Sequence, residues 1–272
     1  MPRRVQRLDA ELVRRGLARS REHAVELIST GRVEVRGVRA TKPASNVDVE
    51  TGIRVVADDS DPGYASRGGT KLAGALAAFP QLPVSGRRCL DAGASTGGFT
   101  DVLLRAGAQQ VVAVDVGYGQ LAWPLRTDER VQVLDRTNVR TLTPDDIGGP
   151  VQLTVADLSF ISLGLVLPAL VACTEPGGDL LPMVKPQFEV GRERLGSGGV
   201  VRDPQQRADA VIGVARSGRE LGWFPRGVVR SPLPGPSGNV EFFLWMRRDE
   251  TDALDDEAIG AVVTAADGEE AT

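Results

Sequence analysis

Short apolar segments alternate with stretches of helical periodicity from Ala65 to Arg248, and few folds satisfy that alternation. The apolar segments have the length of strands, and the stretches between most of them are long enough to return the chain across a sheet. Strands that alternate with helices in this way build a parallel sheet with helices on both faces. We therefore expect a doubly wound α/β domain over residues 65–248.

The expected strands lie at 88–91, 110–115, 131–135, 151–156, 178–184, 224–231 and 240–247. Helices are expected at 69–79, 97–106, 120–126, 163–173 and 204–221. The connection at 232–238 is rich in proline and glycine and leaves no room for a helix between the last two strands. These strands are expected to form a closing hairpin. The result would be a seven-stranded, mostly parallel sheet with one antiparallel strand at that end.

A glycine-rich turn, CLDAGASTGGF at residues 89–99, follows the first expected strand. Small residues at such a turn let a ligand approach the backbone closely. Asp115 ends the second expected strand, 22 residues after Gly93, where an acid suits the ribose hydroxyls of an adenosine cofactor. A dinucleotide is the alternative ligand, but the G-x-G-x-x-G spacing is absent. The candidate cofactor residues are Asp91, Gly93, Ala94, Ser95, Thr96, Gly97, Gly98, Phe99, Asp115 and, at the adenine edge, Asp135.

Four charged residues follow or interrupt apolar segments: Lys71 in SRGGTKL, Asp157 in VADLSF, Lys185 in LLPMVKPQF and Glu241 in GNVEFFLW. Charged side chains seldom enter a protein interior unless they are paired or functional. Asp157 and Lys185 stand at the carboxyl ends of expected strands, where sheets of this type bind ligands. All four are candidate catalytic groups. Taken singly, Lys71 also suits a surface helix and Glu241 an edge strand.

Residues 5–57 are expected to form a small module of two helices, the first at 5–15, followed by short strands that turn at Arg36-Gly37. Residues 1–42 hold eleven Lys and Arg against five Asp and Glu, although the whole chain has a net charge of -4. Guanidinium groups bind phosphate with two parallel hydrogen bonds, so an RNA backbone suits this module. The arginines expected to contact RNA are Arg4, Arg7, Arg14, Arg21, Arg32 and Arg36.

A linker and a tail complete the expected organisation. Residues 58–64, DDSDPGY, are expected to link the basic module to the larger domain. Residues 249–272 contain nine acidic residues and no basic ones, so we expect an acidic disordered tail. The preceding 248 residues carry 32 Lys and Arg against 27 Asp and Glu, a net charge of +5.

Several function classes are disfavoured by composition. Cys89 and Cys173 lie in apolar runs without CxxC spacing, so we expect reduced core cysteines and no metal site. The longest apolar stretch, at 161–173, is shorter than the roughly 20 residues that a membrane span needs. The first 21 residues are basic and lack the apolar core of a signal peptide. We expect a soluble, cytoplasmic protein that acts as a monomer.

These motifs match known families. Residues 5–57, from RLDAELVRRGLARSREHAVELISTGRVEVRG to about GIRVVADD, resemble the S4 RNA-binding domain. The glycine-rich turn with Asp115 is similar to the S-adenosylmethionine site of class I methyltransferases. Lys71, Asp157, Lys185 and Glu241 match the K-D-K-E tetrad of FtsJ-like ribose 2'-O-methyltransferases. Together with SRGGTKL, GASTGGFTD, VDVGYGQL, DLSFISL and VKPQFE, the whole pattern over 5–247 resembles the TlyA family.

The resemblance implies a Rossmann-like class I methyltransferase that uses S-adenosylmethionine to methylate a ribose 2'-hydroxyl, of a cytidine in 16S or 23S ribosomal RNA. Ribosomal RNA or ribosomal subunits would be its partners. Lys185 would act as the base, Glu241 and Lys71 would orient it and the ribose, and Asp157 would fix Lys185 or face the sulfonium.

Two phenylalanines lie near the expected catalytic ends of the strands. Phe160 and Phe188 are expected to stack on a displaced nucleotide, with core packing as the alternative for Phe160. Two other functions stay open from sequence. One is an RNA-binding assembly factor that has lost methyltransferase activity, and the other is a membrane-lytic protein, as the family's haemolysin label suggests.

Overall fold

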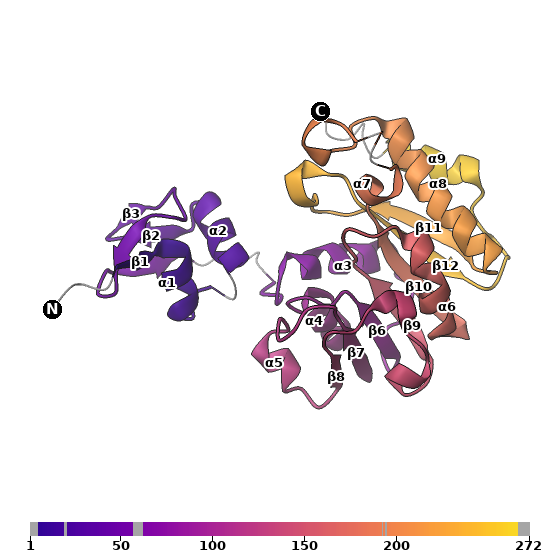
Figure 1. The fold of residues 1–272 in the computed structure, drawn as a ribbon, viewed down its shortest axis with the longest axis horizontal. Helices are drawn as coiled ribbons and strands as arrows, with labels where there is room; N and C mark the ends of the chain where they lie inside the picture. Colours follow the sequence, from indigo (N-terminus) through magenta and orange to yellow (C-terminus); the bar gives the residue numbers. More distant parts are fainter. Residues whose placement is uncertain (1–4, 19–20, 57–61, 192, 194, 266–272) are drawn as a thin grey trace. The chain divides into compact units, whose positions relative to one another are not determined.

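The computed structural model describes residues 5–18, 21–56, 62–191, 193 and 195–265 (Figure 1). The chain divides into two compact units, 1–67 and 68–272. Arg4 and residues 58–61 of the expected linker lie outside the described residues.

The first unit is a small α+β module. Its elements are β1 (Val5–Arg7), α1 (Leu8–Arg14), α2 (Arg21–Ser29), β2 (Val33–Val35), β3 (Val38–Arg39), β4 (Asn46–Asp48) and β5 (Ile53–Val55). The strands form a three-stranded sheet in the order β3-β2-β5 and a two-stranded sheet of β1 and β4. Leu8, Leu12, Leu27 and Ile28 are buried between the helices and the strands.

Two local expectations for this module have different outcomes. The turn at Arg36-Gly37 is confirmed: both residues have positive φ, 53° and 78°, and β2 pairs antiparallel with β3. The expected helix at 5–15 is wrong for its first turn. Val5–Arg7 is a strand, because these residues pair with Asn46–Asp48 and the helix begins only at Leu8.

The second unit alternates strands and helices. Its strands are β6 (Arg88–Ala92), β7 (Gln110–Val114), β8 (Val131–Leu134), β9 (Val151–Ala156), β10 (Thr174–Val184), β11 (Phe224–Arg230) and β12 (Phe242–Arg247). Its α-helices are α3 (Arg67–Ala78), α4 (Gly98–Arg105), α5 (Trp123–Arg126), α6 (Leu167–Ala172), α7 (Pro186–Glu189), α8 (Pro204–Glu220) and α9 (Asp256–Ala265). Helix α3 begins at the last residue of the first unit.

The seven strands form one sheet in the order β11-β12-β10-β9-β6-β7-β8, as the strand pattern predicts. β12 runs antiparallel to both of its neighbours, β10 and β11, whereas the pairings among β10, β9, β6, β7 and β8 are parallel. The predicted hairpin and its single antiparallel strand are therefore confirmed. Because β12 runs in the opposite direction, its first residue lies beside the carboxyl end of β10, where Phe242 pairs with Val184.

Helices cover both faces of this sheet (Figure 1). Side chains alternate along a strand, and β12 shows which helices they meet. Phe242, Leu244 and Met246 join a cluster that includes residues of α6, α8 and α9. Phe243 and Trp245 point to the other face, where their rings contact Phe99 of α4 and Phe79, next to α3, with centroids 5.8 Å and 5.6 Å apart.

The expectation of a disordered tail from residue 249 is wrong for residues 256–265, which form α9. Ile259 and Val263, four residues apart, are fully buried in the cluster beside α8. Asp256 in the first turn of α9 forms ion pairs with Arg216 and Arg219 of α8, at 2.8 Å and 2.6 Å. Asp256 therefore pairs with basic residues of α8, and the acidic composition of this segment does not prevent α9 from folding.

Candidate active site

The carboxyl edge of the sheet gathers the four charged residues. Asp157 follows β9, Lys185 follows β10, and Glu241 precedes β12, whose reversed direction brings it to the same edge. Lys71 lies on the first turns of α3. Lys71, Lys185 and Glu241 are buried, with 8%, 6% and 0% of their surfaces exposed. Neither surface alternative, for Lys71 or for Glu241, agrees with this burial.

Lys71 and Glu241 form a buried ion pair, with Nζ and Oε2 2.5 Å apart. Gln187 adds a longer contact from its amide nitrogen to Glu241 Oε1, at 3.4 Å. Since a carboxylate offers only acceptors, the amide nitrogen is the atom of Gln187 that faces it. The other amide atom, Gln187 Oε1, is buried and has no hydrogen-bond partner within the described residues.

Lys185 and Asp157 form the second ion pair, with Nζ and Oδ1 2.6 Å apart. Lys185 Nζ also donates a hydrogen bond to Ser159 Oγ at 2.9 Å. Pro186 begins α7 immediately after Lys185, and its fixed φ turns the chain away from β10 at that point. The amine is therefore held between two partners on the segment that follows β9.

The glycine-rich turn has the backbone that a close ligand requires. Gly93 and Gly97 have φ of 90° and 95°, and Ser95 between them adopts a positive φ of 47°. A Cβ at Gly93 would lie 2.5 Å from the carbonyl oxygen of Asp157, so only glycine allows the turn to touch that segment. Strained non-glycine residues such as Ser95 are concentrated at functional sites.

Asp91 is fully buried at the end of β6, directly before this turn. Burial, with Asp157 and Asp115 nearby, raises the pKa of Asp91 to about 7 despite a hydrogen bond from Thr100 Oγ1 at 2.6 Å. Its second oxygen, Oδ1, is buried and has no partner within the described residues. An acceptor of this kind fits the ammonium group of an amino-acid moiety.

Asp115 follows β7 and is half-buried. Its two oxygens accept hydrogen bonds from the backbone N–H groups of Ser95, at 2.8 Å, and Gly117, at 2.7 Å. Each oxygen keeps a second lone pair for a ribose hydroxyl. Phe99 differs from its expected role: it is 3% exposed and packs on Phe243, so it belongs to the core.

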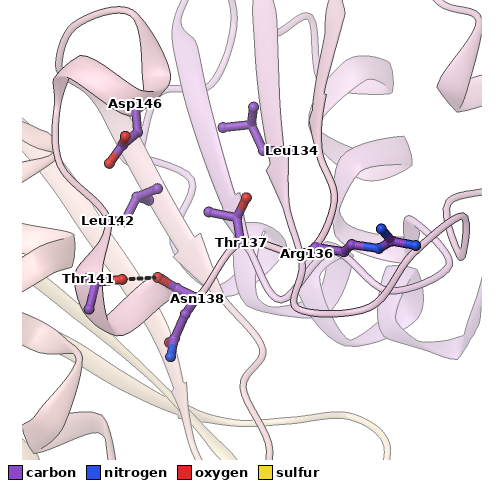
Figure 2. A pocket seen from close by; sticks show the side chains of 7 residues that line it. All are labelled: Leu134, Arg136, Thr137, Asn138, Thr141, Leu142 and Asp146. Carbon is purple, nitrogen blue, oxygen red and sulfur yellow. Dashed lines mark hydrogen bonds between the residues drawn. The ribbon is translucent and has the colours of Figure 1, made fainter.

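One carboxylate oxygen of Asp135 is held by two donors of its own protein. Its Oδ2 accepts a hydrogen bond from Arg126 of α5 at 2.9 Å and from the Gly119 N–H at 3.2 Å. A cavity of about 400 Å³ opens next to it, beyond the end of β8 (Figure 2). The cavity is lined by Leu134, Arg136, Thr137, Asn138, Thr141, Leu142 and Asp146. It includes none of the four charged candidates.

Phe160 and Phe188 stand on the two segments that carry Asp157 and Lys185. Their ring centroids are 5.2 Å apart. Phe160 is 91% exposed and has a positive φ of 65°, so the core alternative is wrong for this residue. An exposed aromatic ring held in a strained conformation suits contact with a ligand.

Three of the arginines expected to bind RNA have partners within the first unit. Arg7 and Arg21 bind the carboxylate of Asp9 at 2.7 Å and 3.0 Å, and Arg14 binds Glu11 at 2.6 Å. Both acids are buried, whereas the three arginine side chains are about half exposed. These arginines therefore stabilise the module and still present part of the guanidinium to solvent.

The remaining arginines differ in exposure. Arg32 is half-buried and donates to the Val56 carbonyl at 3.2 Å. Arg36, in the β2–β3 turn, and Arg39, at the end of β3, are exposed, and neither forms an ion pair with any described residue.

Sequence patterns alone did not indicate three residues that contact the candidate site: Gln187, Ser159 and Glu189. Two are uncharged and lie in segments without periodicity, and Glu189 has no partner nearby in sequence. The only local signal was their position within two residues of Asp157 or four of Lys185.

Comparisons with known proteins agree with this geometry. Residues 64–248 match the FtsJ-like methyltransferase family model, and residues 6–53 match the S4 domain. The chain is 63% identical over 248 residues to the 16S/23S rRNA (cytidine-2'-O)-methyltransferase TlyA of Mycobacterium tuberculosis, covering 91% of this chain and 92% of that protein.

Two further relatives carry hemolysin names. Hemolysin A of Brachyspira hyodysenteriae is 34% identical over 237 residues, which cover 87% of this chain and 97% of that protein. A solved structure of a hemolysin-named protein from Streptococcus thermophilus has a TM-score of 0.79 and 38% identity, covering 98% of this chain and 97% of that one. Among the described residues, no helix is long and apolar enough to cross a membrane, and no group of three His, Cys, Asp or Glu is placed to hold a metal ion.

Proposed function

Because this chain belongs to the FtsJ-like methyltransferases, within the TlyA group that carries an S4 domain, we propose that it methylates the ribose 2'-hydroxyl of a cytidine in 16S or 23S ribosomal RNA. The main support for this proposal is that two ion pairs, Lys71–Glu241 and Lys185–Asp157, lie at one edge of the sheet beside the glycine-rich turn. The whole set comes from one chain, so the site needs no second copy, and we propose a cytoplasmic monomer.

The residues around the turn fit S-adenosylmethionine as the cofactor. The unpartnered Asp91 Oδ1 would accept the ammonium group of its methionine part, and Asp115 would accept the ribose hydroxyls. When bound, this cofactor supplies an electrophilic methyl group on a sulfonium. The positive φ of Gly93 and Gly97 gives the turn the backbone shape on which such a ligand would lie.

The tetrad would prepare the ribose for reaction. Once Lys185 has released one proton to solvent, its neutral amine, held by Asp157 and Ser159, would take the proton of the 2'-hydroxyl as that oxygen forms its bond to the methyl carbon. The Lys71–Glu241 pair would hold the ribose and the neighbouring backbone in line. Most of this contribution is positioning, which agrees with the pairing of all four groups and the burial of three of them, Lys71, Lys185 and Glu241.

The basic module would hold the RNA. An S4 domain with exposed guanidinium groups suits recognition of phosphates and RNA shape. The exposed ring of Phe160, beside Phe188, would stack on the base of the target nucleotide once it leaves its helix.

The test is a comparison of ribose methylation in ribosomal RNA treated with the wild-type protein and with Lys185→Ala and Lys185→Arg. Both variants should lose methylation by about 100-fold or more and keep binding of S-adenosylmethionine and RNA, because the amine acts mainly in the transition state. Arginine should also fail, because a guanidinium does not release its proton. Near-normal turnover of Lys185→Arg would reduce the role of this residue to positive charge. Cofactor binding by wild type without methylation of any ribosomal RNA would favour an assembly factor.

A further inference from the structure

Glu189 links two segments of the candidate site. It ends α7, four residues after Lys185, and is half-buried. Its Oε2 accepts a hydrogen bond from Ser162 Oγ at 2.6 Å, and its Oε1 accepts one from the Leu163 N–H at 2.8 Å. Ser162 Oγ in turn accepts a hydrogen bond from the Gly164 N–H at 3.2 Å. Ser162 thereby caps the start of the short 3-10 helix at Leu163–Leu165. One carboxylate therefore joins the segment after β9 to the segment after β10.

The joined segments carry the two members of one catalytic ion pair. Residues 157–162 hold Asp157 and have no helix or strand of their own, and Phe160 among them has a positive φ of 65°. Residues 185–189 hold Lys185. The Lys185 contacts to Asp157 and Ser159 tie the segments at one end, and the Phe160–Phe188 ring contact lies between them. Glu189 closes the other end.

The type of residue at this position also needs an explanation. A partly buried carboxylate is costly, and burial raises the pKa of Glu189 above its ordinary value. Among the described residues it has no cationic partner and touches none of the four tetrad residues. Hydrogen bonds to a charged acceptor are shorter and stronger than those to a neutral one, so a carboxylate makes a firmer tether than an amide or hydroxyl.

We propose that Glu189 is a positioning residue for methyl transfer: its carboxylate fixes the segment after β9 so that Asp157 and Ser159 keep the Lys185 amine aligned with the substrate hydroxyl. This rests on the proposed function. A tether of this kind affects the alignment of reacting groups, while the Asp157 N–H keeps its own hydrogen bond to the Ala92 carbonyl beside the cofactor turn, at 3.0 Å. Misplacement by about 1 Å costs up to roughly 100-fold in rate, which sets the expected size of the effect.

The experiment uses the full-length protein and three substitutions. Glu189→Leu removes both acceptors and should lower kcat for ribosomal RNA methylation by about 10- to 100-fold, with the Kd of S-adenosylmethionine unchanged. Glu189→Gln keeps one acceptor and should recover part of kcat. Ser162→Ala should lower kcat in the wild-type background and have no further effect in Glu189→Leu, because both changes cut the same link.

A control separates positioning from stability. Asp179 is another buried carboxylate, bonded to Arg87 at 2.5 Å and Trp245 at 2.7 Å, in the middle of β10 and six residues before Lys185. Asp179→Asn should lower the melting temperature and leave kcat unchanged at temperatures where the protein is folded. Amide hydrogen exchange at Leu163 reports the tether directly: exchange should accelerate in Glu189→Leu and stay slow in Asp179→Asn.

The outcomes are distinguishable from failure of the proposed function. If wild type does not methylate ribosomal RNA, the function is wrong, and Leu163 exchange still shows whether the tether exists. If wild type is active and a folded Glu189→Leu protein with fast Leu163 exchange keeps its kcat, the positioning role is wrong. Additive effects of Ser162→Ala and Glu189→Leu would also overturn it, as would a loss of cofactor affinity equal to the loss of kcat.

Discussion

Asp91 and Asp9 are both buried carboxylates, and their surroundings move their pKa values in opposite directions. Asp91 lies in the sheet, where no cation of the described residues pairs with it, and burial raises its pKa to about 7. Asp9 lies in the small module, where a hydrogen bond from Arg7, with a second from Arg21, lowers its pKa to about 2. The paired acid stabilises its module above the ordinary range of carboxylate titration. The unpaired acid opposes folding there, which is typical of groups kept for binding or catalysis.

The sign of the Asp91 effect gives a prediction for stability. Its folded pKa is above its unfolded value of 3.8, so the folded state retains the proton while the unfolded chain ionises. Wild type should therefore lose stability as pH rises from about 4 to about 7, relative to Asp91→Asn, which cannot ionise. Over this pH range the free energy of unfolding of wild type should fall, relative to that of Asp91→Asn, by on the order of a few kcal/mol, since one pKa unit corresponds to about 1.4 kcal/mol.

Urea denaturation of both cofactor-free proteins at pH 5 and pH 8 measures this difference. Asp128→Asn, in an exposed loop where Arg130 lowers the pKa of the acid, serves as the control and should show no such fall. A gap between wild type and Asp91→Asn that is the same at both pH values would show that Asp91 stays ionised in the folded protein.

Among the elements, α9 folds although its sequence begins with acidic residues, because its apolar face is buried. Its sequence is acidic at the start and apolar at 258–263, and its apolar face is covered by α8 and β11. The ion pairs of Asp256 with Arg216 and Arg219 are partly exposed, so packing supplies most of the stabilisation. The helix therefore belongs to the folded methyltransferase unit.

Two neighbouring positions of α9 test this assignment. Ile259 is fully buried and Val262 is 39% exposed. Ile259→Ala should lower the free energy of unfolding by about 2–4 kcal/mol, because it removes packed methylene groups and leaves a cavity. Val262→Ala should change it by less than about 0.5 kcal/mol. Equal small effects in chemical denaturation would mean that α9 is not docked in solution.

Local signals predict most of the large unit and fewer features of the small one. Apolar runs bounded by proline and glycine predict every strand of the seven-stranded sheet, because such signals lie within each segment. β1 is missed because Val5–Arg7 becomes a strand only by pairing with residues about forty positions away. α9 is missed because its burial depends on α8. At the site, charge in an apolar context indicates the tetrad, whereas the contacts of Gln187, Ser159 and Glu189 arise only when separate segments meet.

At the scale of the whole molecule, the charged groups of the two units have different roles. The first unit combines a basic surface with arginines that also neutralise buried acids, and the second contains the tetrad. Affinity for RNA and catalysis should therefore be separable by substitution, provided that the arginines tested have no structural partner.

Arg36 meets that condition and Arg14 does not. Arg36→Ala should weaken binding to ribosomal RNA and reduce the slope of log affinity against log salt by about one, because it removes one phosphate contact. Its thermal stability should be unchanged. Arg14→Ala should also lower the stability of the first unit, since Glu11 then loses a partner in a buried site.

The measurement is full-length protein binding to ribosomal RNA over a salt series, with thermal unfolding and S-adenosylmethionine binding measured on the same samples. An unchanged salt slope in both Arg36→Ala and the double variant with Arg39→Ala would show that the β2–β3 turn does not contact RNA.

The place of β12 in the sheet has a consequence for the order in which the protein is made. β12 lies between β10 and β11, although it is the last strand to be synthesised. A growing chain that ends at Arg230 contains the glycine-rich turn, Lys185 and Asp157, but Lys71 still lacks Glu241, 170 residues further along. β11 has no neighbour in the sheet until the next seventeen residues, up to Arg247, follow it. The nascent protein should therefore remain inactive until its final strand is inserted, and a chain truncated before residue 241 should bind no substrate productively.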